Sequence, residues 1–314
     1  MKVGLIVDSA CDLPHDFIRK HGIFILPLTA KIDNQTFIDD HNPDTTEDFY
    51  RQGLLGKGHH AETEAFSAAQ IRDLFLEKVV PNYDIAICET VDRSRSQIYS
   101  NASEAMNMVM AHAKAVREKA GVEGNFTMRV IDSGQLFAGQ GLLAAYTISL
   151  LGKGLSKNAL RHEVEKFAQN VWICVVPNDL SYIRERARRR GDKSVSGLVA
   201  FLGKALNITP IIWGKGVVAK PAAKTRSKDA AVEKVMNYAV TRVKAGLLAP
   251  VVSLSCGMSW EEIEALPGLD RLREVCKEHN VELLLSRMGI TSSIYIGPGS
   301  VCLSLAAEEH EFEG

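Results

Sequence analysis

The chain has 314 residues, of which 46% are hydrophobic and 24% are charged. These proportions are typical of a globular protein of about two domains, and they exclude disordered, collagen-like and coiled-coil chains. Its 37 basic and 38 acidic side chains leave a net charge of −1, so no overall field attracts nucleic acid or anionic membranes. We therefore expect no nucleic-acid partner and at most a transient membrane contact.

Short apolar runs alternate with amphipathic helical patterns along the first half of the chain. The runs predict strands at residues 2–7, 23–28, 84–88 and 127–131. The amphipathic patterns predict helices at residues 14–21, 45–54, 67–79, 97–119 and 139–151. Such alternation is typical of strands joined by crossover helices. We predict a first α/β domain over residues 1–165, with a mostly parallel, doubly wound sheet.

The pattern changes after a break rich in glycine, lysine and serine at residues 152–156, which precedes a helix predicted at residues 157–169. Further strands are predicted at residues 172–176, 208–213, 217–220, 251–256, 282–285 and 292–296. Only Gly214-Lys215-Gly216 separates the second and third of these, and so short a connection forces antiparallel pairing. We predict a second α/β domain over residues 166–314, with a mixed or antiparallel sheet flanked by helices.

Several functional classes lack their usual sequence signals. The longest apolar run, residues 141–151, is about half of the ~20 residues that span a bilayer, and Asp8 comes too early for a signal-peptide core. The six cysteines are scattered singly, which favours small buried side chains over disulfides or metal ligands. Phosphate-binding loops and the G-x-S-x-G elbow of hydrolases are missing. We expect a cytoplasmic protein with no metal site and no bound cofactor.

Polar residues follow the first predicted strand, at the edge of a parallel sheet where α/β proteins bind ligands. Asp8 and Ser9 stand at the end of that strand, and Asp12 lies two residues before Pro14, where it is suited to cap a helix. Thr63 and Ser96 also lie ahead of predicted helices. Each residue alone is explained by helix capping, whereas several helix starts facing one crevice form an anion site. Both interpretations stay open.

An arginine-rich segment follows in the second half. Five guanidinium groups fall within seven positions, at Arg184, Arg186, Arg188, Arg189 and Arg190. Such a run is either a solvated helix face or a docking patch for an acidic partner, a phosphate or lipid head groups.

Short motifs in a fixed order resemble one known family. Residues 6–14 read I-V-D-S-A-C-D-L-P, residues 130–133 read V-I-D-S ahead of G-Q-G at 139–141, and residues 202–212 read L-G-K-A-L-N-I-T-P-I-I. Residues 297–299 read G-P-G. In this order and spacing, they resemble the DegV family of bacterial lipid-binding proteins from one end of the chain to the other.

The resemblance implies two α/β domains that enclose a long-chain fatty acid at their interface. It also implies a carrier rather than an enzyme, one that presents the acyl carboxylate to a separate fatty acid kinase. Thr63 and Ser96 match the positions of the family's hydroxyl groups that bind the carboxylate. Tyr295 stands where the family usually has a histidine, two residues before G-P-G, and Glu64 replaces a serine.

Glu64 raises an electrostatic question, because two like charges 4 Å apart repel by about 4 kcal/mol at an effective dielectric near 20. We hypothesise that Arg93 or Arg95 neutralises Glu64 or binds the ligand head, while the Tyr295 hydroxyl replaces the histidine. Ser9 is a further candidate neighbour of the head group. The alternative is that Glu64 simply points to solvent.

A second function comes from a different class. Asp8, Glu64 and Asp132 could serve as acid/base groups or magnesium ligands for a small phosphorylated substrate. A lipid carrier requires an apolar tunnel behind its polar edge, whereas this enzyme would require a wet cleft in which the carboxylates converge.

Overall fold

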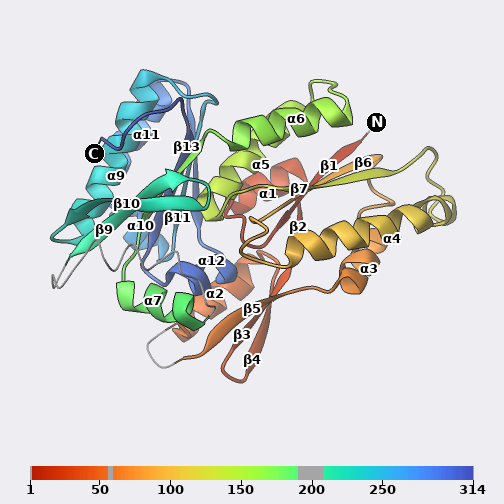
Figure 1. The fold of residues 1–314 in the computed structure, drawn as a ribbon, viewed down its shortest axis with the longest axis horizontal. Coiled ribbons are helices and arrows are strands. Elements are labelled where there is room, and N and C mark those ends of the chain that lie inside the picture. Colours follow the sequence, from red (N-terminus) through yellow and green to blue (C-terminus); the bar gives the residue numbers. More distant parts are fainter. Residues whose placement is uncertain (1, 56–58, 190–207, 314) are drawn as a thin grey trace.

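The computed structural model describes residues 2–55, 59–189 and 208–313. Two sheets lie side by side, each flanked by helices, and a smaller sheet lies below the first one in the view of Figure 1. The fold is therefore α/β with one parallel and one mixed sheet, as predicted. The predicted division between residues 165 and 166 falls inside α6 (Lys157–Ala168), which leads directly into the second sheet.

The first sheet is wholly parallel, in the order β2-β1-β6-β7. Its strands are β1 (Val3–Asp8), β2 (Phe24–Leu26), β6 (Ile85–Thr90) and β7 (Thr127–Asp132). Helices α3 (Ala68–Lys78) and α4 (Ile98–Lys119) cover one face, and α1 (His15–His21) and α5 (Phe137–Leu151) cover the other. The apolar stripe of α4 is buried against the sheet, as its sequence spacing predicts.

A three-stranded antiparallel sheet, in the order β4-β3-β5, was not predicted. It consists of β3 (Leu28–Ile32), β4 (Gln35–Asp39) and β5 (Ala61–Ala65), with α2 (Pro43–Gln52) between the last two. The strand predicted at residues 23–28 ends at Leu26 because Pro27 separates β2 from β3. The sequence of β5, A-E-T-E-A, carries little strand propensity, so its pairing with β3 decides its conformation.

The second sheet is mixed, in the order β10-β9-β8-β13-β11-β12, and only β11 and β12 run parallel. Its strands are β8 (Val171–Val176), β9 (Thr209–Lys215), β10 (Val218–Thr225), β11 (Val251–Cys256), β12 (Glu282–Arg287) and β13 (Val301–Ala306). Helices α9 (Lys228–Ala245), α10 (Trp260–Glu264) and α11 (Leu269–Glu278) pack on one face. Helix α5 packs between this sheet and the first, which explains why most of its side chains are buried.

One predicted strand is wrong: residues 292–296 belong to helix α12 (Ile290–Ile296). Nearly every side chain of this segment is buried, so no polar face reveals a helical period in the sequence. The strand that completes this part of the sheet is β13, which the sequence pattern did not single out.

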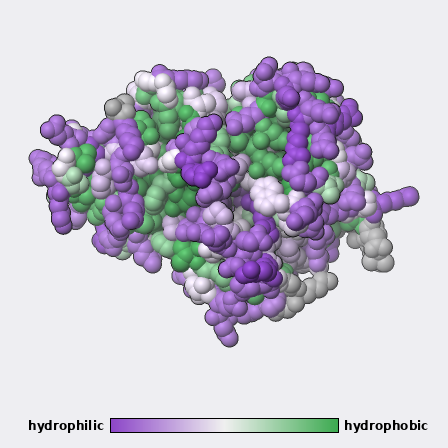
Figure 2. All heavy atoms as spheres, turned by 180° about the vertical axis from the view of Figure 1, so that it is seen from behind, coloured by the Kyte–Doolittle hydropathy of each residue, from purple (hydrophilic) through white to green (hydrophobic). Residues whose placement is uncertain are grey.

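All six cysteines are buried and free, as predicted. No helix within the described ranges is long and apolar enough to cross a membrane. Seen from behind, hydrophilic residues form most of the outline of the molecule, and hydrophobic residues show mainly in the middle of each half (Figure 2).

Candidate functional site

A cavity of about 1220 Å³ lies between the two halves of the chain. Its apolar wall is one face of the second sheet, where Ile173 and Val175 of β8 and Ile212 of β9 point into it. Strand alternation sends the neighbouring residues Trp172 and Cys174 of β8 to the opposite face, into the core beneath α9. Other apolar lining residues are Leu28, Val91, Leu136, Phe137, Ile183, Val217, Ala219, Pro221 and Ile296.

Two hydroxyl groups from distant parts of the sequence meet at this cavity. Thr63 lies in the middle of β5, and Tyr295 lies near the end of α12. The Thr63 Oγ1 and Tyr295 hydroxyl oxygens are 3.0 Å apart, and both residues are partly buried. The structure therefore brings together Thr63, which the resemblance assigns to the carboxylate, and Tyr295, whose hydroxyl was expected to replace the family's histidine.

Glu64 borders the cavity, but strand alternation turns it to the face of β5 opposite Thr63. Its carboxylate forms an ion pair with Lys31 of the neighbouring strand, and 62% of its side chain is exposed. Arg93, hypothesised to neutralise Glu64, instead pairs with Asp132 at 3.0 Å. Glu64 is thus paired with a lysine and largely exposed to solvent, and in this respect the structure agrees better with the alternative than with a pair between Glu64 and Arg93.

The loop between β6 and α4 forms a polar border of the cavity and contains Arg93, Ser94, Arg95 and Ser96. The Ser96 Oγ accepts a hydrogen bond from the backbone N–H of Ile98, the first residue of α4, at 3.2 Å, and Ser96 also lines the cavity. Capping and ligand contact are thus compatible at this position.

The three carboxylates of the enzymatic alternative have separate roles. Asp8 is completely buried, and burial raises the pKa of its carboxyl to about 6. It accepts hydrogen bonds from the backbone N–H groups of Ala10 and Val91, at 2.9 and 2.6 Å. Asp132 accepts backbone hydrogen bonds that shape two loops, and Glu64 pairs with Lys31. Across the described ranges, no three His, Cys, Asp or Glu side chains are grouped so that they could hold a metal ion. The converging polar cleft that this enzyme requires is not formed by these residues.

Two residues expected at the sheet edge have structural roles. The buried Ser9 hydroxyl accepts the Leu28 N–H at 2.9 Å and donates to the Asp39 carbonyl, and Ser9 is not among the lining residues. Asp12 does not cap α1, whose N-cap is Pro14 without a side-chain hydrogen bond. Its carboxylate instead contacts the second half of the chain.

Sequence reasoning missed the role of Arg186, one residue of the arginine run. It lies on α7 (Leu180–Arg189), it is only 6% exposed, and it lines the cavity, whereas Arg184 and Arg188 are exposed. Arg190 is outside the described residues. Spacing offers one signal, because Tyr182 lies one helical turn before Arg186 and its ring contacts the guanidinium at 4.9 Å.

The buried Arg186 guanidinium donates to the backbone carbonyls of Ala61 and His59. Within the described part of the chain, no carboxylate forms an ion pair with it. A buried guanidinium that the described residues pair with no carboxylate is energetically costly, so its charge favours binding of an anion in the cavity. The cavity thus combines an apolar wall with a positive charge and two facing hydroxyl groups.

Comparison with known proteins gives a consistent match over the whole chain. A family model described as "Uncharacterised protein, DegV family" matches residues 2–308. A DegV domain-containing protein of Xanthomonas axonopodis pv. citri is 39% identical over 312 residues, which is 99% of each chain.

Solved structures with the same fold have lower sequence identity. A stearic acid-binding protein of Eubacterium ventriosum has a TM-score of 0.75 at 20% identity, over 96% of this chain and 97% of that one. The fatty acid kinase (Fak) B3 protein of Streptococcus pneumoniae, loaded with linoleic acid, has a TM-score of 0.70 at 17% identity, over 98% and 100% of the chains.

Proposed function

The chain belongs to the DegV family, and we therefore propose that it binds a long-chain fatty acid, or a closely related acyl lipid, in the cavity between its two halves. Two structural relatives, one binding stearic acid and one loaded with linoleic acid, support this ligand class. In this proposal the protein is a carrier that performs no reaction itself. The domains proposed from the sequence, residues 1–165 and 166–314, then enclose the ligand.

The acyl chain supplies most of the binding free energy. Burying ~14 methylene groups at ~0.8 kcal/mol each contributes about 11 kcal/mol, from which several kcal/mol are lost to association and ordering. The apolar lining from β8, β9 and β10 provides the surface for this burial. The polar side chains at the head-group end of the cavity then mainly set the orientation of the ligand and select its head group.

The observation that carries the proposal is the Thr63–Tyr295 pair beside the buried Arg186. Arg186 is tied to the carbonyl of Ala61, two residues before Thr63 on β5. Tyr182, which contacts Arg186, donates a hydrogen bond to the Ile294 carbonyl next to Tyr295. A carboxylate placed here would accept charge-assisted hydrogen bonds from these groups, and we assign Ser96 as a further donor from the polar loop.

We propose a fatty acid kinase as the protein partner. The structural likeness to the fatty acid kinase B3 protein supports this class of partner. The partly exposed loop beside the head-group site, with Arg93 70% exposed, offers a surface through which a kinase could reach the carboxylate.

Mass spectrometry of the extracted ligand tests the proposal. Protein purified from a bacterial host, denatured and extracted into organic solvent, should release about one equivalent of a long-chain acyl lipid. Arg186→Gln should release several-fold less, whereas Arg184→Gln, an exposed position on the same helix, should match the wild type. An extract without lipid, together with delipidated protein that takes up no fatty acid, would overturn the proposal.

A further inference from the structure

The short helix that carries Tyr295 is held by side chains from the other half of the chain. Asp12, which follows β1, accepts hydrogen bonds at the start of α12 from the Gly289 N–H at 3.1 Å and the Ser292 hydroxyl at 2.8 Å. Its second oxygen accepts the Ser255 hydroxyl of β11 at 2.8 Å. The Asp12 carboxylate thereby connects β1 to two elements of the second half.

Asp39, at the end of β4, makes a similar contact. Its carboxylate accepts the Thr291 backbone N–H in the first turn of α12 at 2.7 Å. These N–H groups have no partner within the helix, so carboxylates are the groups expected to stabilise them. Both carboxylates are buried at the contact, with Asp12 0% and Asp39 1% exposed.

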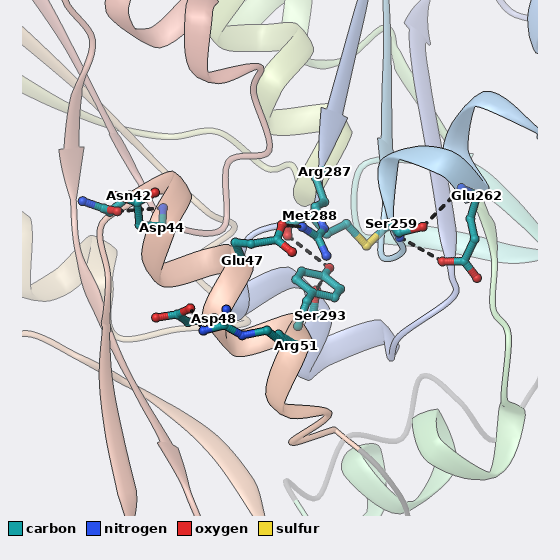
Figure 3. A network of polar contacts seen from close by, with 11 residues as sticks. Asn42, Asp44, Glu47, Asp48, Arg51, Ser259, Glu262, Arg287, Met288 and Ser293 are labelled. Atoms are coloured by element: carbon teal, nitrogen blue, oxygen red, sulfur yellow. Dashed lines mark hydrogen bonds and ion pairs between the residues drawn. The ribbon is translucent and has the colours of Figure 1, made fainter.

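Tyr50 of α2 provides a third contact, at the middle of α12. Its hydroxyl donates to the Met288 carbonyl at 3.1 Å and lies 2.5 Å from the Ser293 Oγ. Figure 3 shows Ser293 and Met288 close to Glu47 on α2, which reaches across to pair with Arg287. The Arg287 guanidinium in turn lies 3.9 Å from the centre of the Tyr50 ring.

None of Asp12, Asp39 and Tyr50 lines the cavity. Helix α12 has only seven residues, a length at which a helix has little stability of its own. Its position is therefore set by contacts with its surroundings, and these three side chains supply contacts from its first residue to its middle. The position of Tyr295, one turn beyond Thr291 on the same helix, therefore depends on these contacts.

We propose that Asp12, Asp39 and Tyr50 are positioning residues of the head-group site, which fix α12 so that the Tyr295 hydroxyl faces Thr63. This inference rests on the proposed fatty acid function. Loosening α12 affects the hydroxyl pair but leaves the apolar wall on β8 and β9 in place. Loss of a positioning residue therefore weakens discrimination between head groups more than it weakens binding of the acyl chain.

The test compares the affinity for palmitic acid with that for methyl palmitate, using delipidated protein. The ester keeps the acyl chain but has no charge, so the ratio of the two affinities reports on the head-group site. Tyr50→Phe removes only one hydroxyl, and we expect it to lower the ratio about three- to tenfold. Tyr83→Phe is the matched control, because its hydroxyl bonds the Gly22 carbonyl away from the cavity.

A double-mutant cycle separates a positioning role from a general effect on stability. Tyr295→Phe should lower the ratio by itself, and adding Tyr50→Phe should lower it little further, because both act through the same hydroxyl. Asp12→Asn provides a second variant with the same expected pattern. The inference would be overturned if Tyr50→Phe and Asp12→Asn left the affinity ratio unchanged. It would also be overturned if the fold-loss in each double mutant with Tyr295→Phe equalled the product of the two single-mutant losses. Wild-type protein that binds neither ligand would instead overturn the proposed function.

Discussion

The buried carboxyl of Glu89 allows the effect of burial on a side-chain pKa, and through it on stability, to be measured. It lies on β6 and is completely buried, and the Thr147 hydroxyl of α5 donates to its Oε1 at 2.5 Å. Its Oε2 has no hydrogen-bond partner among the described residues. Burial raises the pKa of this carboxyl from its ordinary value of 4.5 to about 7, with the Thr147 hydrogen bond opposing the shift. The folded protein therefore favours the neutral form.

The sign of the effect on stability follows from this direction. A raised pKa in the folded state stabilises the protein below the ordinary value of 4.5, and the contribution is lost as the pH rises through about 7. At 1.36 kcal/mol for each pKa unit, ionised Glu89 lowers the free energy of unfolding by about 3 kcal/mol well above pH 7. Glu89→Gln removes this titration while keeping the side-chain shape.

Urea unfolding at pH 5 and pH 8.5 measures the difference. We expect the stability of Glu89→Gln relative to wild type to increase between these pH values, by about 2–3 kcal/mol. Asp8 and Asp12 also have raised pKa values, but they are present in both proteins and cancel in the comparison. Glu104→Gln, at an exposed position on α4, is the control and should change stability by less than about 0.5 kcal/mol. A difference between variant and wild type that does not vary with pH would refute the reasoning.

Two further predictions concern the start of α5. A Cβ atom at Gly141 would overlap the Asp12 carbonyl oxygen. Gly141→Ala should therefore lower the free energy of unfolding by about 1–3 kcal/mol. An unchanged midpoint of urea unfolding would contradict this packing. Phe137 has a φ of +50°, which costs about 1–2 kcal/mol for a residue with a side chain, yet its ring is buried beside Tyr295 with centroids 6.3 Å apart. Phe137→Gly removes that strain but loses about 3–5 kcal/mol of ring packing. We therefore expect calorimetry to show a free energy of unfolding about 2 kcal/mol lower than that of the wild type. A variant more stable than the wild type would contradict this expectation.

Much of the fold could be predicted because local patterns agree with tertiary packing. The buried stripe of α4 and the continuous apolar runs of β1 and β6 are set by burial against neighbouring elements, which leaves a periodic trace in the sequence. Helix α12 and strand β5 leave no such trace. The first is buried on nearly all sides, and the second is specified by pairing with β3 rather than by its own residues.

The candidate site was less accessible to sequence reasoning. Thr63 and Tyr295 are 232 positions apart, so their 3.0 Å contact could be anticipated only through the family resemblance. Glu64 faces away from Thr63 because β5 is a strand, and its sequence does not indicate a strand, so this orientation could not be predicted either. The role of Asp12 could not be found from the sequence, because its short-range context suits a helix cap, whereas its partners lie more than 240 positions later in the chain.

A crystal structure of the protein with bound palmitic acid tests the central claim most directly. We expect the acyl chain to lie along Ile173, Val175 and Ile212, with the carboxylate within hydrogen-bond distance of Thr63, Tyr295 and Arg186. A fatty acid bound with its carboxylate away from these three side chains, or a cavity that stays free of lipid at saturating palmitic acid, would contradict it.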